Sequence, residues 1–253
     1  MKRLITDYFL YRHRTFIGYI LVGLIIVGLL ILSVFLLPIG LREAEIASAI
    51  TSADLSHISF NPNSVINLPY HLMQKLSIMF FGFTELSIKL PSLFLGVLTA
   101  IGLVLLLSRW FKTNIAIATT VIMVASTYFM FIIQDGTPII LFIFLTVWLL
   151  LSALFVSRHR YFTTLWKVTM LSLAALMLYV PLGIYLLIAL ATAAVIHPHI
   201  RFIIKRMSKL RLALASTFAL GLLTPLIYSI FLNPKVGLTL LGIPESMPNV
   251  TNN

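Results

Sequence analysis

The chain contains a series of long apolar segments separated by short polar ones. These apolar stretches cover residues 16–37, 90–107, 115–133, 139–156, 163–179, 182–196 and 212–232. A helix needs roughly 20 mostly apolar residues to cross the hydrocarbon core of a bilayer. The pattern therefore predicts an all-α fold, a polytopic membrane helix bundle of about seven spans.

Two of these boundaries need an argument of their own. Residues 16–37 are too long for the apolar region of a signal peptide, about 7–15 residues, so we interpret them as a retained first span. Residues 163–196 form one apolar run that is too long for a single crossing. Pro181 and Gly183 lie near its middle, and both disfavour a helix interior. We therefore expect two short spans that meet in a tight turn.

The positions of the charged residues orient the bundle. With residues 1–15 in the cytoplasm, only Arg42, Lys75, Lys89 and Lys235 of the 18 Lys and Arg residues fall outside, and Asp7 is the only acid inside. This is the positive-inside pattern. It places the C-terminal tail, residues 233–253, on the outer face. It also explains the net charge of +11 without a nucleic-acid partner.

The composition agrees with a membrane protein. The chain is 60% hydrophobic and 10% charged, with a mean hydropathy of +1.06. A soluble domain would have too few polar residues to cover that much apolar surface. The absence of cysteine excludes disulfides, thiol catalysis and cysteine metal sites. We interpret residues 1–253 as a single membrane domain in the cell membrane.

The first outer loop, residues 38–89, is much longer than the other loops. Residues 41–53 contain few helix breakers, and they alternate between an apolar face and a polar face at helical spacing. The apolar face carries Ile46, Ala49, Ile50 and Ala53, and the polar face carries Glu45, Ser48 and Ser52. A second helix can begin at Pro69 and end at Gly82. The loop thus predicts two short amphipathic helices on the outer membrane surface.

Three outward acids are candidates for chemistry. Glu43 and Glu45 follow the first span, but two helix positions so spaced point about 200° apart, so both cannot face one site. A carboxylate here can act as a general base on an incoming hydroxyl, or it can be a solvated first-turn acid favoured by the helix dipole. Asp135 is either part of an Asp-Gly turn or a second carboxylate that assists a divalent metal or orients a substrate.

Four outward basic residues are candidates for binding a phosphate, because charged donors form the strongest hydrogen bonds to phosphate oxygens. They are Arg42, His71, Lys75 and Lys89. The alternative is that they extend toward lipid head groups. The sequence predicts no metal-ligand cluster, and it leaves the need for a divalent metal open.

Several short motifs follow one another in a recognisable order. They are the acidic stretch at 41–47, Asn67-Leu68-Pro69-Tyr70, Phe81-Gly82-Phe83-Thr84-Glu85, Lys89-Leu90-Pro91-Ser92, Asp135-Gly136-Thr137-Pro138 and Tyr179-Val180-Pro181-Leu182-Gly183. In this order they resemble the N-terminal membrane module of the glycosyltransferase C superfamily. The closest branch contains protein O-mannosyltransferases and lipid A aminoarabinose transferases.

The resemblance implies sugar transfer from a polyprenyl-phosphate donor to an acceptor at the outer face. By this resemblance Glu43 is the general base, and the prenyl tail lies in a groove between spans, in contact with membrane lipid. From their positions at the outer face, we add Asp135 as the second catalytic carboxylate and Glu45 as a substrate-binding residue. The sequence leaves open whether a partner chain completes the site. The chain departs from the family at Arg42, where Asp is usual, at Asn67, where Lys is frequent, and at Lys89, where Arg is usual.

Two other functions compete with this one. A non-catalytic membrane subunit or lipid-binding protein would keep the fold without activity, and the departures and the short chain favour it. A small-solute transporter is disfavoured, because transporters place ionisable groups in mid-span and these spans have almost none. Convergence of Glu43 and Asp135 on one outward cavity would favour the enzyme, whereas a Glu43 that faces bulk water would favour the subunit.

Overall fold

The structure is a computed structural model that describes residues 18, 20–32, 40–55, 62–158, 163–197 and 209–243. All regular elements in these ranges are helices, which confirms the all-α prediction for this part of the chain. They are the helix Ile20–Leu32, α2 (Glu43–Asp54), the 3-10 helix η1 (Pro62–Val65), α3 (Leu68–Phe81), α4 (Glu85–Leu107), α5 (Thr113–Val124), α6 (Thr127–Gln134), α7 (Ile139–Arg158), α8 (Thr163–Met177), α9 (Gly183–Ile196), α11 (Lys209–Leu232) and α12 (Lys235–Leu240).

Helices occupy all seven predicted spans, but not all of them are long enough to cross a membrane. Within the described residues, α4, α7 and α11 are long and apolar enough to cross a membrane. The bent pair of α5 and α6 makes a fourth span if it is counted as one. The helix Ile20–Leu32, α8 and α9 are apolar but shorter. The chain is therefore a membrane protein with three or four clear spans, and the count of seven stays a prediction.

The apolar run over residues 115–133 does not form one straight helix, because α5 and α6 meet at a bend of 64°. Ser126 lies at the break. Its hydroxyl donates to the carbonyl of Met123 (2.6 Å) and accepts from the amide of Phe129 (3.4 Å), so it caps the start of α6. The Ser126 side chain competes with the helix backbone for these hydrogen bonds, and a hydropathy average does not detect such an effect.

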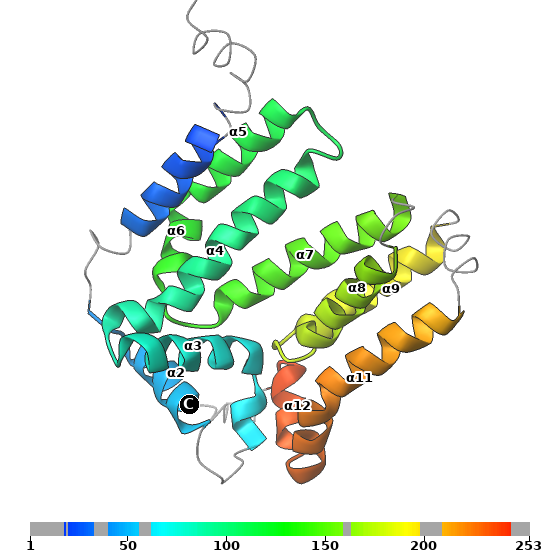
Figure 1. Cartoon of the computed structure of the whole chain (residues 1–253). Coiled ribbons are helices and arrows are strands. Elements are labelled where there is room, and N and C mark those ends of the chain that lie inside the picture. The colour runs from blue at the N-terminus through cyan, green and yellow to red at the C-terminus, as the bar shows by residue number, and fades with distance from the viewer. Residues whose placement is uncertain are drawn as a thin grey trace, which may run out of the picture.

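The long helices pack in a row (Figure 1). Helix α4 contacts α5, α6 and α7, while α8 contacts α7 on one side and α11 on the other. Helices α2 and α3 lie together across one end of α4, and α12 lies at the same end of the bundle (Figure 1). The amide of Asn67, just before α3, donates to the carbonyl of Tyr179 (2.8 Å), which joins the start of α3 to the turn after α8.

The turn between α8 and α9 lies where Pro181 and Gly183 predict it, since α8 ends at Met177 and α9 begins at Gly183. The backbone approaches itself closely here: a Cβ on Gly183 would lie 2.1 Å from the carbonyl oxygen of Met177. The amide of Leu182 donates to the carbonyl of Leu240 (2.9 Å), so α12 closes over the same turn.

This contact predicts that Gly183→Ala destabilises the protein. The new methyl group would force the backbone of the turn to move, which we expect to cost roughly 1–3 kcal/mol and to lower the thermal unfolding midpoint in detergent. Gly221→Ala in α11 is the matched control, because a Cβ there would have no neighbour within 4 Å. Equal midpoints for the two variants would contradict the prediction.

Candidate functional site

Glu45 joins the start of α2 to the loop between α6 and α7. The side chain is buried, with 2% of its surface exposed. Its Oε2 accepts from the amide of Arg42 (2.8 Å), as a glutamate at the third helical position does in a capping box. Its Oε1 accepts from the amide of Gly136 (2.7 Å), which lies 91 residues further along the chain. One carboxylate thus fixes the start of α2 and holds the distant loop against it.

Gln74 of α3 is a second connection to the same loop, and its side chain is fully buried. Its Nε2 donates to the carbonyls of Ile88 (3.1 Å) and Gly136 (3.2 Å). Its Oε1 accepts from the hydroxyls of Ser48 (3.0 Å) and Ser52 (2.6 Å) of α2. The side chain therefore uses both donors and both acceptor positions of its amide. This role of Gln74 was not predicted from the sequence, although Gln74 follows the candidate His71 at helical spacing on the buried side of α3.

Helices α2 and α3 turn their polar side chains toward each other and their apolar side chains outward. Buried polar residues on the two helices are Glu45, Ser48, Ser52, His71, Gln74 and Ser77. Exposed apolar residues are Ile46, Ile50, Leu72, Leu76, Met79, Phe80 and Phe81. Helices α2 and α3 cover the two predicted segments, and their place on an outer membrane surface stays a prediction. Ala49 lies on the buried side rather than with Ile46 and Ile50. A soluble helix pair would show the opposite distribution.

His71 lies in this polar seam and not at a surface. Its Nδ1 is 2.8 Å from the hydroxyl oxygen of Ser52, and the side chain is buried. Burial lowers the pKa of His71 to about 4. The imidazole is therefore uncharged at neutral pH, which favours a structural role over the phosphate contact that its sequence position suggests.

The loop that carries Asp135 is also held by α4. The hydroxyl of Ser92 donates to the carbonyl of Asp135 (2.7 Å) and lies 2.8 Å from the hydroxyl of Tyr70. Burial raises the pKa of Tyr70, so its hydroxyl stays protonated. The backbone of this loop is thus bonded to side chains of α2, α3 and α4.

The Asp135 side chain is buried, and its Oδ1 has no hydrogen-bond partner among the described residues. Burial raises the pKa of this carboxyl group and is the largest effect. The Thr137 side chain lowers the pKa, the negative charge of Glu45 raises it, and the positive charges of Arg42 and Lys89 lower it. A buried carboxyl oxygen without a partner is a group that a ligand can satisfy. This favours a functional Asp135 over a simple turn residue.

The candidate cations differ in their surroundings. Arg42 is exposed, and its guanidinium carbon lies 4.4 Å from the ring centroid of Phe131 in α6. Lys89 is buried, with Nζ 2.7 Å from Oε1 of Glu85, and Lys75 is half-buried on α3. Arg42 is therefore the exposed candidate that lies beside the loop of Asp135.

Glu43 lies in the first turn of α2 and is exposed, unlike the buried Asp135. The two predicted catalytic carboxylates thus have different environments, and the carboxylate that reaches the Asp135 loop is Glu45. Within the described residues, no group of three or more His, Cys, Asp or Glu side chains could hold a metal ion.

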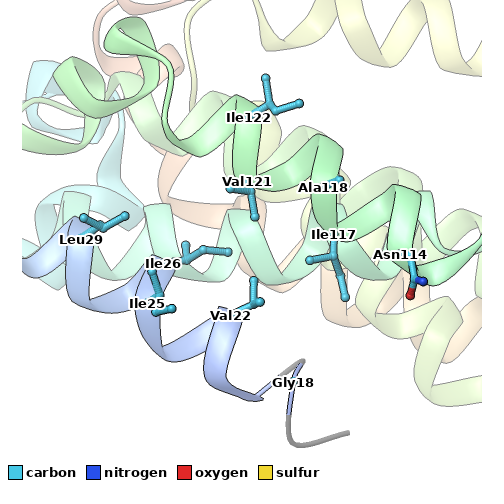
Figure 2. A pocket seen from close by; sticks show the side chains of 10 residues that line it. All are labelled: Gly18, Val22, Ile25, Ile26, Leu29, Asn114, Ile117, Ala118, Val121 and Ile122. Atoms are coloured by element: carbon cyan, nitrogen blue, oxygen red, sulfur yellow. The ribbon is translucent and has the colours of Figure 1, made fainter. Parts of the chain in front are cut away.

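A groove of about 760 Å³ runs between the helix Ile20–Leu32 and α5 (Figure 2). Aliphatic side chains from both helices line it, among them Val22, Ile26, Ile117 and Val121. Asn114 is the one polar side chain among the described lining residues. The groove therefore suits an apolar chain.

The comparisons with known proteins agree with the motifs. The sequence profile of the dolichyl-phosphate-mannose-protein mannosyltransferase family matches residues 68–228, which is more than half of the chain. The matched region includes Gln74, Ser92 and Asp135 and begins after Arg42, Glu43 and Glu45. No curated protein and no solved structure matches the chain significantly. The profile match shows that this membrane protein belongs to the dolichyl-phosphate-mannose-protein mannosyltransferase family, within the glycosyltransferase C superfamily, as the order of its motifs predicts.

Proposed function

We propose that the protein transfers a sugar from a polyprenyl-phosphate donor to an acceptor hydroxyl at the outer membrane face. Family membership supports a membrane glycosyltransferase. The observation that carries the proposal is the contact of Glu45 with the Asp135 loop, which assembles a buried carboxyl group beside the exposed cation Arg42.

The proposed topology places α2 and α3 at the outer face, with seven spans, a cytoplasmic N-terminus and an external C-terminus. The charge distribution along the bundle supports it. The acids Glu43, Asp54 and Glu85 belong to α2 and the start of α4, whereas Arg109 and Lys112 lie beyond the far end of α4. The exposed apolar faces of α2 and α3 then rest in the interface of the outer leaflet.

In the proposed reaction Glu43 is the general base. The acceptor oxygen attacks the anomeric carbon, its proton passes to the Glu43 carboxylate, and a new carbon–oxygen bond forms. The bond between the anomeric carbon and the phosphate oxygen breaks, and its electron pair leaves with the polyprenyl phosphate. The Arg42 guanidinium stabilises the developing phosphate charge, and Asp135 orients the sugar.

The groove beside α5 is the proposed site for the prenyl tail of the donor. The lining of the groove is mostly aliphatic, and the groove runs along α5. After the bend at Ser126, α5 is followed by α6, whose Phe131 ring lies against the Arg42 guanidinium. A donor with its phosphate near Arg42 would have an apolar path for its tail on the same side of the bundle. Burial of that tail supplies binding energy in proportion to the apolar area covered.

A second candidate function is a non-catalytic membrane subunit or lipid-binding protein. The exposure of Glu43 favours it, as does the presence of Arg42 where the family usually has Asp. Either protein could work with a partner chain. Direct tests of topology and activity separate the two candidates.

Labelling of introduced cysteines tests the topology, and no native thiol of the chain can react because the sequence contains no cysteine. Asp54→Cys and Lys112→Cys place single thiols at exposed positions on α2 and before α5. In intact cells, a membrane-impermeant maleimide should label Cys at 54 and leave Cys at 112 unlabelled until the membrane is opened. Labelling in the reverse order would place the loop in the cytoplasm and remove the proposed reaction.

Glu43→Gln should lower sugar transfer by about 10²-fold or more, the factor that a general base typically contributes. The measurement is the mass-spectrometric profile of surface glycans and glycolipids in a deletion strain that carries each variant. Asp54→Asn is the matched control, because Asp54 is an exposed acid at the other end of the same helix. Full rescue by Glu43→Gln would exclude Glu43 as the base, and an unchanged profile after deletion would favour the non-catalytic subunit.

Ala118→Trp should weaken binding of the lipid-linked donor, since the indole would fill the groove that Ala118 lines. We expect the KM for the donor to rise roughly tenfold, which corresponds to about 1.4 kcal/mol of lost apolar contact. Ile188→Trp on α9 is the control, because Ile188 is exposed and lies outside the groove. An equal KM in both variants would place the tail elsewhere.

A further inference from the structure

The backbone around Asp135 is held more tightly than a surface loop requires. The carbonyl of Asp135 accepts from Ser92, the amide of Gly136 donates to Glu45, and the carbonyl of Gly136 accepts from Gln74. The first two groups belong to one planar peptide unit, so both of its polar atoms are held by side chains. Three helices therefore determine where the Cα of Asp135 lies.

Gly136 allows this arrangement because it has no side chain. A Cβ at this position would lie 2.9 Å from Cγ2 of Ile88 and 3.4 Å from Oε1 of Glu45. The loop is therefore pressed against α4 and against the carboxylate that binds it. Any displacement of Glu45 would move the peptide next to Asp135.

Glu45 is itself poorly placed to touch a substrate. It is buried, and each of its two carboxylate oxygens already accepts from a backbone amide. The sequence analysis included Glu45 among substrate-binding residues, whereas its contacts favour a different role.

We propose that Glu45 is a positioning residue: by holding the peptide between Asp135 and Gly136, and by its negative charge, it orients Asp135 for the reaction. The inference rests on the proposed transfer reaction. The charged groups that act on Asp135 are Glu45 and Arg42 at the start of α2 and Lys89 of α4, and Asp135 in turn acts on the neighbouring Tyr70 of α3. Of these, Glu45 combines a direct bond to the loop with a negative charge.

Glu45→Gln tests both parts of the proposal. The amide can still accept from Gly136, but its NH2 group then faces the amide of Arg42, and the negative charge is gone. We expect kcat to fall about 10–100-fold, because a small misplacement of a catalytic group slows the reaction by about this factor. The KM for the donor should be nearly unchanged. Because the charge of Glu45 raises the pKa of Asp135, the limb of the pH–rate profile that reports Asp135 should move to lower pH.

Ser92→Ala separates position from charge. It frees the carbonyl of Asp135 and leaves Glu45 intact, so kcat should fall while the pH–rate profile keeps its place. Asp54→Asn again serves as the control for a change elsewhere on α2. Thermal unfolding midpoints in detergent show whether each variant is folded.

Three outcomes would overturn the proposal. In Glu45→Gln, a raised KM with normal kcat would mean that Glu45 binds the substrate, and a wild-type kcat and pH profile would mean that it has no role in the reaction. If Glu45→Gln does not fold, a wild-type kcat for Ser92→Ala would overturn it. The absence of transfer by the wild-type protein would instead reject the proposed function, so the two failures are distinguishable.

Discussion

One constraint shapes the end of the bundle where α2 and α3 lie: the peptide groups between α6 and α7 must find hydrogen-bond partners within the protein. A buried amide or carbonyl without a partner costs about 1–3 kcal/mol. Side chains from α2, α3 and α4 meet this requirement, and in doing so they fix α2 and α3 across the end of the bundle. The hydrogen bonds that stabilise the fold are thus the ones that build the candidate site.

The same constraint explains the arrangement of side chains on α2 and α3. Buried polar side chains such as Glu45 and Gln74 bond to the other helix or to the loop, whereas large apolar side chains are exposed, as Phe80 with 80% of its surface exposed illustrates. In water such a surface would promote aggregation. Against a lipid leaflet it is favourable, which connects the high apolar content of the chain to the architecture of its site.

Much of the fold could be predicted from the sequence, because spans and helix breakers depend on local composition. Long apolar runs located the helices, Pro181 and Gly183 located the turn before α9, and the order of the motifs indicated the family. The break at Ser126 was not predictable from hydropathy, since one serine in an apolar run changes the average little. The site was harder. The spacing of Glu43 and Glu45 shows that they face apart, but packing alone decides that Glu45 turns inward, and Gln74 acquires its role only when three helices meet.

The bond between Gly136 and Glu45 has a further consequence for dynamics. An amide hydrogen that is bound to a buried carboxylate exchanges with deuterium from the solvent only when that contact opens locally. The exchange rate at Gly136 therefore reports how often α2 separates from the loop between α6 and α7. This single proton therefore reports the opening of the contact that holds α2 against the residue next to Asp135.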